Sequence, residues 1–189
     1  MSTPKNGFSL YTKETAPEGS KPSLEQVEKG FGFVPNIFGV MAESPAATEA
    51  YLMLNKLVQD KTALSPVEQQ VALLAISEHN GCDYCVAAHT GSAERAKVDP
   101  AVLEALRSGS KLPDEKLDAL ATYARTVIDK KGWVDESDVQ ALLDAGYTRQ
   151  QLFDVYVALS LKTISNYVNH VADTPLDAAL QAKALKKAS

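Results

Sequence analysis

Helix start and stop signals recur along almost the whole chain and constrain its fold more than any other feature. The most complete start signal is a capping serine, Ser65, with proline at position 66 and Glu68 at the third helical position. Cap residues also precede apolar stretches that begin at residues 45, 100, 115, 136 and 149. Sustained apolar–polar alternation, the signal of half-buried strands, is absent from the sequence. We therefore predict an all-α domain of about seven to nine helices.

The length and composition fit one globular domain. The chain has 189 residues, of which 45% are hydrophobic and 23% charged, so it can bury a core of its own. We expect a polar N-terminal lead-in over 1–21 and a single helical domain over 22–189. Ser23 with Gln26 predicts the first helix, ended by Gly30, and Thr174 followed by proline predicts the last. The segment 66–80 is apolar nearly all round, so we expect it to be central or at a subunit interface.

Charge and hydropathy exclude several classes of partner. The net charge is -5 and no basic stripe stands out, so we expect no nucleic-acid partner. No segment resembles a signal peptide, and no apolar run approaches the length of a membrane span. We therefore expect a cytoplasmic protein without membrane association. In that compartment paired cysteines usually indicate redox chemistry or a metal site, because structural disulfides are rare there.

Both cysteines and two of the three histidines lie in the segment EHNGCDYCVAAH, residues 78–89. The preceding helix breaks at Gly81, so a new helix is expected to begin at or just after Cys82. Helical spacing then places Cys82, Cys85 and His89 within a stripe of about 60° on one face. The start of a helix favours thiolate over thiol, and an imidazole one turn beyond Cys85 can accept its proton. Oxidation can join the two sulfurs in a small disulfide loop.

Zinc binding and simple packing are alternatives to the redox interpretation. C-x-x-C is half of a common zinc site, but the second ligand pair that usually completes the site is absent from this sequence. A fourth ligand would have to come from Glu78, His79 or His170. Two buried cysteines that only pack are the third interpretation.

Several polar residues outside the motif are further candidates. Glu78 lies at the C-terminal end of a helix, where its charge opposes the helix dipole, so it is a candidate for a proton relay. A solvent-facing residue at a frayed helix end is the alternative for Glu78. Asn166 and His170 are i, i+4 neighbours on a long predicted helix and are candidates to face one pocket, although the dipole alone also accounts for His170. Glu68 is already explained by its capping role, and His79 has no assigned role.

The segment LSPVEQQVALLAISEHNGCDYCVAAHTGSAERA resembles the carboxymuconolactone decarboxylase-like superfamily, and specifically its alkylhydroperoxidase D (AhpD)-like peroxidase branch. C-x-x-C-x-x-x-H is the redox motif of that branch. The segments GFVPNIFGVMAESPA and LKTISNYVNHVADTPLD also resemble peroxidase-related members, so the resemblance spans roughly residues 30 to 177. It implies an all-α fold, homo-oligomers (trimers or hexamers) and thiol-dependent reduction of organic hydroperoxides or hydrogen peroxide.

The resemblance also implies roles for individual residues. Cys85 corresponds to the peroxide-attacking thiol, Cys82 to the resolving thiol, and His89 to the base that activates Cys85. The family relay often has a glutamate at the position of Gln70, and a glutamine cannot exchange a proton at neutral pH. We hypothesise that Glu78 substitutes for that glutamate through a bridging water.

The expected partners follow from this chemistry. They are a hydroperoxide substrate and an external dithiol or redoxin that reduces the disulfide. No cofactor is expected, because the sequence lacks a phosphate-binding glycine motif and the implied reaction needs neither metal nor flavin nor nicotinamide. Two other functions remain open: a general dithiol–disulfide oxidoreductase without peroxidase activity, and a non-catalytic zinc-binding or interaction module.

Overall fold

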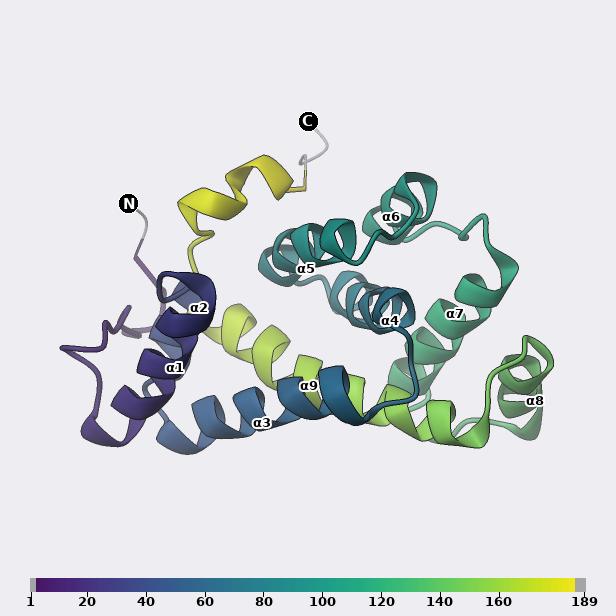
Figure 1. The fold of residues 1–189 in the computed structure, drawn as a ribbon, viewed down its shortest axis with the longest axis horizontal. Helices are drawn as coiled ribbons and strands as arrows, with labels where there is room; N and C mark the ends of the chain where they lie inside the picture. Colours follow the sequence, from purple (N-terminus) through teal and green to yellow (C-terminus); the bar gives the residue numbers. More distant parts are fainter. Residues whose placement is uncertain (1–2, 186–189) are drawn as a thin grey trace.

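The computed structural model describes residues 3–185, and this part of the chain is helical without any strand (Figure 1). No helix in it is long and apolar enough to cross a membrane. The all-α prediction is thus confirmed. The α-helices are α1 (Lys21–Phe31), α2 (Asn36–Met41), α3 (Pro45–Lys61), α4 (Pro66–His79), α5 (Asp83–Arg95), α6 (Pro100–Arg107), α7 (Glu115–Asp129), α8 (Glu136–Asp144) and α9 (Arg149–Ala172), and the two 3-10 helices are η1 (Glu18–Ser20) and η2 (Ala178–Lys183).

Local capping determines where most helices begin. Ser65 and Glu68 form a reciprocal capping box at α4: the Glu68 backbone N–H donates to Ser65 Oγ, and the Ser65 N–H donates to the Glu68 carboxylate. Thr148 and Gln151 do the same at α9. The predicted starts at residues 45, 66, 100, 115, 136 and 149 are all confirmed.

The predicted first helix has the wrong boundaries. Helix α1 begins at Lys21 rather than after Ser23, because Pro22 occupies the first turn, where a proline costs no hydrogen bond. The helix continues through Gly30 and ends at Gly32, which takes the left-handed conformation with φ 80°.

The predicted last helix is also wrong. Thr174 does not start a helix, and the chain forms only η2 further on. The reason is tertiary: the Pro175 carbonyl, which a helix would use internally, accepts a hydrogen bond from Asn36 Nδ2 at 2.9 Å. Asp177 Oδ1 likewise accepts from the Asn36 backbone N–H at 3.0 Å. These contacts tie the C-terminal segment to the start of α2.

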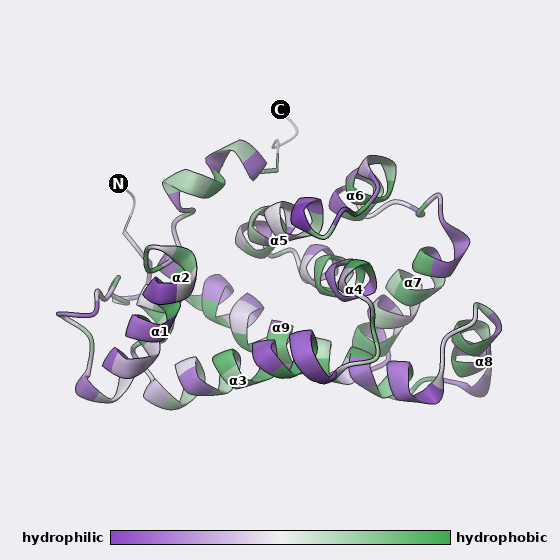
Figure 2. Ribbon diagram, in the orientation of Figure 1, coloured by the Kyte–Doolittle hydropathy of each residue, from purple (hydrophilic) through white to green (hydrophobic). Residues whose placement is uncertain are grey.

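Helix α4 is the centre of the fold, as its apolar sequence predicted. Its residues from Val71 to Ser77 are all buried, and it packs against α3, α5, α6, α7 and α9. Figure 1 shows α4 between α5 and α9, with α7 beside it. Most of the other helices carry both hydrophobic and hydrophilic residues along their length (Figure 2), as expected for helices with one packed face.

The N-terminal segment, in its described residues 3–20, packs on the helical domain. The Lys5 backbone N–H donates to the Ala172 carbonyl at 2.6 Å, and the Tyr11 N–H donates to the Gly39 carbonyl at 3.1 Å. A side chain at Gly39 would place its Cβ 2.9 Å from the Tyr11 carbonyl oxygen, so only glycine permits this close approach. The segment thereby covers α2, which lies over one side of the cysteine pair.

Candidate active site

The junction between α4 and α5 positions the two cysteines. Gly81, with φ 68°, reverses the chain, and Cys82 then serves as the N-cap of α5. Cys85 lies in the first turn of α5, so the predicted helix start just after Cys82 is confirmed. Both thiols are free and buried, with 2% of Cys82 and 3% of Cys85 exposed.

Helix α9 supplies the polar groups that contact the two sulfurs. Asn169 Nδ2 donates to Cys85 Sγ at 3.2 Å and to Cys82 Sγ at 3.6 Å. Ser165 Oγ lies 3.9 Å from Cys85 Sγ. One amide therefore holds both sulfurs on the same side, and its partial positive charge favours a thiolate over a thiol.

Lys162 is a buried cation beside the pair. It is 1% exposed, and among residues 3–185 no carboxylate forms an ion pair with it. A buried, unpaired ammonium costs several kcal/mol, so this site favours an anion next to it. Burial alone would lower the pKa of Lys162, but the charge of a Cys85 thiolate, with a smaller contribution from Tyr51, raises it. The anion that compensates Lys162 is thus the Cys85 thiolate.

The two cysteines are electrostatically unlike each other. Burial favours the neutral thiol of Cys85, but a hydrogen bond from Cys82, the charge of Lys162 and the amides of Asn169 and Asn166 together hold its pKa well below the usual range. The hydrogen bond that Cys82 donates to Cys85, together with burial, raises the pKa of Cys82. These surroundings favour the thiolate at Cys85 and the neutral thiol at Cys82.

His89 lies next to the pair in a neutral form. Burial, and then the charges of Lys162 and Arg95, hold the pKa of His89 well below its ordinary value. His89 Nδ1 is 3.1 Å from Oε1 of Gln70, an oxygen that can only accept, so the proton is on Nδ1 and Nε2 keeps a free lone pair. The structure thus brings Gln70 and His89 together, but the cation beside Cys85 is Lys162 rather than an imidazolium.

A cavity of about 570 Å³ opens onto Cys85. Cys85, His89, Gln70 and Lys162 line it together, although they come from three different helices. Aromatic side chains form much of the remaining wall; they are Phe31, Phe33, Phe38, Tyr51 and Tyr84. The reactive thiolate therefore faces a largely apolar chamber with a few polar groups, the usual character of a small-molecule site.

Glu78 is not part of this arrangement. Its carboxylate lies 3.4 Å from Arg125 of α7 and packs against Gly109, where an added Cβ would come within 2.4 Å of Oε1. Glu78 therefore projects from α4 toward α6 and α7, whereas Gln70 projects toward α5. The structure does not bring Glu78 to the cysteines, so its position gives no support to a relay role.

Asn166 and His170 do not face one pocket. Asn166 is buried and accepts a hydrogen bond from Asn80 Nδ2 at 2.9 Å. His170 is exposed and lines a second cavity, of about 480 Å³, together with Cys82 and Asn169. The two residues diverge because only the face of α9 that carries Asn166 points into the core.

Two other observations bear on His79 and on the zinc-binding alternative. His79 Nε2 lies 2.7 Å from Asp129 Oδ1 on the α7 side, so it is also remote from the pair. Among the described residues, no three side chains of the types His, Cys, Asp and Glu gather as a metal site would require.

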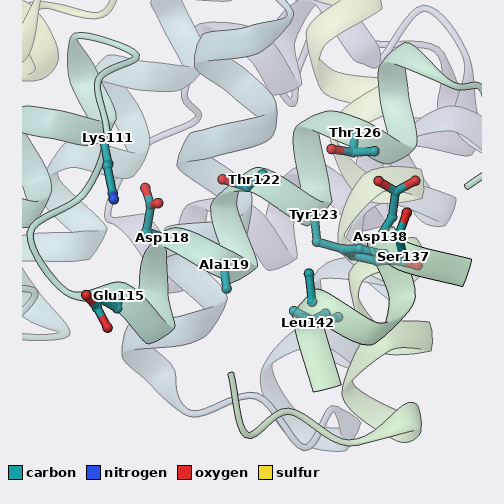
Figure 3. Close-up of a pocket in the computed structure, with 11 residues that line it drawn as sticks. Lys111, Glu115, Asp118, Ala119, Thr122, Tyr123, Thr126, Ser137, Asp138 and Leu142 are labelled. Atoms are coloured by element: carbon teal, nitrogen blue, oxygen red, sulfur yellow. The ribbon is translucent and has the colours of Figure 1, made fainter. Parts of the chain in front are cut away.

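A third cavity, of about 370 Å³, lies between α7 and α8 and is shown in Figure 3. No cysteine or histidine lines it.

Sequence reasoning missed the contribution of α9. Lys162, Ser165 and Asn169 are spaced i, i+3, i+7, the same spacing as the cysteines and His89 on α5. A lysine on the buried face of an otherwise apolar helix segment was the available signal, but only the packing of α9 against α5 gives that lysine a partner.

Comparisons with known proteins agree with this fold. The chain has the AhpD-like helical fold: it matches the structure of an alkylhydroperoxidase AhpD core, an uncharacterized peroxidase-related protein from Ralstonia eutropha JMP134, with TM-score 0.82 and 21% identity over 95% of both chains. A peroxidase-related protein from Silicibacter sp. TM1040 matches with TM-score 0.77 and 19% identity, over 95% of this chain and 97% of that one. The debrominase Bmp8 in complex with 2,3,4-tribromopyrrole matches with TM-score 0.75 and 19% identity, over 96% and 97%.

The segment that carries the C-x-x-C motif matches a family model. Residues 43–111, from the end of α2 to the end of α6, match the carboxymuconolactone decarboxylase family. This match covers less than half of the chain, and it agrees with the superfamily resemblance of the sequence. No curated protein matches the chain.

Proposed function

We propose that this protein is a thiol-dependent peroxidase that reduces hydroperoxides through Cys85 and Cys82. The observation that carries the proposal is the pairing of Cys85 with the buried Lys162 at the wall of a cavity of about 570 Å³. A thiolate is the reactive form of cysteine, and here it is next to a second thiol that can resolve the oxidised product.

In the first step the Cys85 thiolate attacks the distal oxygen of the hydroperoxide. An S–O bond forms, the O–O bond breaks, and the leaving alkoxide takes a proton and departs as an alcohol, or as water from hydrogen peroxide. Lys162 lines the cavity beside Cys85 and can donate that proton. Once Cys85 is oxidised to the sulfenic acid, Lys162 loses its compensating charge, so the buried ammonium gives up its proton readily.

In the second step Cys82 attacks the sulfur of the Cys85 sulfenic acid. The S–S bond forms while the S–O bond breaks, and the departing hydroxide takes the proton that Cys82 releases and leaves as water. The neutral Lys162 amine can carry that proton between the two sites. His89, with its free Nε2, can accept a hydrogen bond from the peroxide O–H and orient it in the cavity.

An external dithiol or redoxin then reduces the Cys82–Cys85 disulfide and restores the starting state. A thiolate of the reductant attacks one sulfur of the disulfide, and Cys85 is the better leaving group because its thiolate is stabilised by Lys162. The proposal keeps the homo-oligomeric state, trimer or hexamer, which the family resemblance implies, and the cytoplasmic location expected from the sequence.

The burial of the pair favours a peroxidase over a general dithiol–disulfide oxidoreductase. With 2% and 3% of the two cysteines exposed, a small peroxide that enters the cavity reaches Cys85 more readily than the disulfide of a folded protein does. Halogenated aromatics are a second class of electrophile to test, because aromatic residues line the cavity and one structural relative is a debrominase.

A single-turnover assay tests the proposal. Pre-reduced protein is mixed with cumene hydroperoxide in the absence of any reductant, and the loss of peroxide is measured. The wild type is expected to consume about one equivalent per chain, and Cys85→Ser none. Equal consumption by the wild type and Cys85→Ser would show that the protein is not a Cys85-dependent peroxidase.

A further inference from the structure

The cavity at Cys85 differs in charge from the rest of the protein. The chain has a net charge of -5, yet in the part of the chain that the structure describes no aspartate or glutamate lines this cavity. Its charged side chains are Lys162, deep beside the thiolate, and Arg95, at the C-terminal end of α5. The nearby carboxylate of Asp177 is held behind Tyr84, whose hydroxyl donates to it. Because Lys162 is compensated by the thiolate, Arg95 is the cation left for a ligand.

Arg95 is placed to receive an anion. Its guanidinium folds back along α5: Nη2 donates to Ser92 Oγ at 2.9 Å, and Nη1 lies 3.6 Å from the position that a Cβ on Gly91 would take. The charge of Arg95 acts on His89, which precedes it by six residues on α5 and lines the same cavity. Arg95 is exposed, and no ion pair to a carboxylate is found for it among residues 3–185. Most of its five N–H donors are therefore open to a ligand, in the planar arrangement that suits a carboxylate.

The space between Arg95 and Cys85 is apolar. Phe31 and Phe33 line this cavity although they are 56% and 41% exposed, and Phe38, Leu73 and Leu180 continue the wall inward. Exposed aromatic side chains at the rim of a cavity favour the binding of an apolar part of a ligand between them.

We propose that the preferred substrate is an amphipathic organic hydroperoxide, with a carboxylate that binds Arg95 and an apolar chain that carries the peroxide to Cys85. The inference rests on the proposed peroxidase function and deepens it. The guanidinium lies near the level of Gly91, six residues along α5 from Cys85, which corresponds to about 9 Å along the helix axis. A chain of several carbon atoms must separate the carboxylate from the peroxide, so long-chain carboxylic acid hydroperoxides fit and small peroxides leave Arg95 unused.

Turnover with a matched pair of substrates tests the preference. Linoleic acid hydroperoxide and its methyl ester share one apolar body and differ in charge, and both are used below their micellar concentrations. The ratio of kcat/KM for the acid over the ester is expected to be about five in the wild type, the effect of one partly exposed ion pair, and to fall to about one in Arg95→Gln. Arg95→Lys keeps the positive charge and is expected to keep part of the preference for the acid over the ester. Arg149→Gln, which removes an exposed charge that lines none of the three cavities described above, is expected to keep all of the preference.

Equilibrium binding of linoleate and methyl linoleate to the reduced protein separates this inference from the proposed function. These ligands carry no peroxide, so their binding does not depend on the redox reaction. The acid is expected to bind the wild type about fivefold more tightly than the ester, and this difference is lost in Arg95→Gln but not in Arg149→Gln. If the acid binds more tightly than the ester but no peroxide is consumed, only the proposed peroxidase function is contradicted. Peroxide turnover with equal binding of acid and ester, or a preference that survives in Arg95→Gln, would overturn the carboxylate site.

Discussion

Lys162 and Cys85 form a buried cation–thiolate pair in which each group depends on the other. Lys162 is 1% exposed and Cys85 3% exposed, they line one cavity, and no carboxylate among the described residues competes for Lys162. The thiolate keeps the lysine protonated despite its burial, and the lysine keeps the cysteine ionised. In the family that the sequence resembles, the position of Gln70 often holds a relay glutamate, and we propose that this pair activates the thiol without that carboxylate.

Replacement of Lys162 by methionine is predicted to raise the pKa of Cys85 and slow its reaction. Without the ammonium, burial returns the thiol toward its neutral form, so the thiolate fraction at neutral pH and the alkylation rate with iodoacetamide fall at least about tenfold. The measurement is the alkylation rate against pH in a Cys82→Ser background. Lys130→Met is the matched control, because Lys130 pairs with Asp138 far from the cavity. An unchanged pH profile in Lys162→Met would show that the lysine does not activate Cys85.

The same Lys162→Met variant is predicted to stabilise the oxidised protein. In the disulfide form Lys162 has no anion beside it and is left as a buried polar group without an ionic partner, whether it keeps or loses its proton. Replacing it with an apolar side chain of similar length is therefore expected to gain about 1–4 kcal/mol in the free energy of unfolding. Chemical denaturation of the oxidised and reduced forms measures the effect. A loss of stability in the oxidised form would mean that another group compensates the Lys162 charge.

Asn169 is predicted to control the thiolate through its single amide. Asn169→Ala removes a hydrogen bond to an ionised sulfur, worth about 1.5–3 kcal/mol, and is expected to raise the pKa of Cys85. Asn169→Asp adds a negative charge at the same place and is expected to slow peroxide reduction further. The reaction rate against pH distinguishes the two variants, and equal rates for Asn169→Ala and the wild type would contradict the assigned contact.

His89 is predicted to make the protein acid-sensitive. The folded-state pKa of His89 lies well below its ordinary value of about 6.5, so below pH 6.5 the unfolded state binds a proton that the folded state does not. Stability is therefore lost as the pH falls through this window, by up to about 1.4 kcal/mol per pH unit. Thermal unfolding of the wild type and His89→Gln between neutral pH and pH 5 checks this. The wild type should lose more stability than the variant, and parallel losses would contradict a neutral, buried imidazole.

Glu78 is predicted to contribute to stability and not to the reaction. Its partly exposed pair with Arg125 is worth at most about 1 kcal/mol, so Glu78→Gln is expected to lower the free energy of unfolding slightly and leave single-turnover peroxide consumption within about twofold of the wild type. Denaturation and the single-turnover rate are measured on the same preparation. A tenfold loss of rate with unchanged stability would restore Glu78 as a relay.

Features fixed by local interactions could be predicted from the sequence, and features fixed by packing could not. Ser65 with Glu68 defines the start of α4 within four residues, and Gly81 with Cys82 defines the start of α5 in the same way. The predicted helix after Thr174 is wrong because Asn36, far away in the sequence, takes the Pro175 carbonyl.

The candidate site divides in the same way. Cys82, Cys85 and His89 lie on one helix, and their spacing was sufficient to bring them together. Glu78 is close to them in sequence, but the direction in which it leaves α4 depends on α7, which no local pattern specifies. Lys162 belongs to the site only because α9 packs beside α5.

The most direct test is to identify the residue that the hydroperoxide oxidises. Reduced Cys82→Ser protein, which cannot form the disulfide, is treated with one equivalent of cumene hydroperoxide and a sulfenic-acid trap, and the modified residue is located by peptide mass spectrometry. A Cys85 thiolate peroxidase predicts one trapped sulfenic acid per chain, at Cys85, formed at least about tenfold more slowly in the Lys162→Met background. Peroxide consumption without oxidation of Cys85, or no consumption at all, would contradict it.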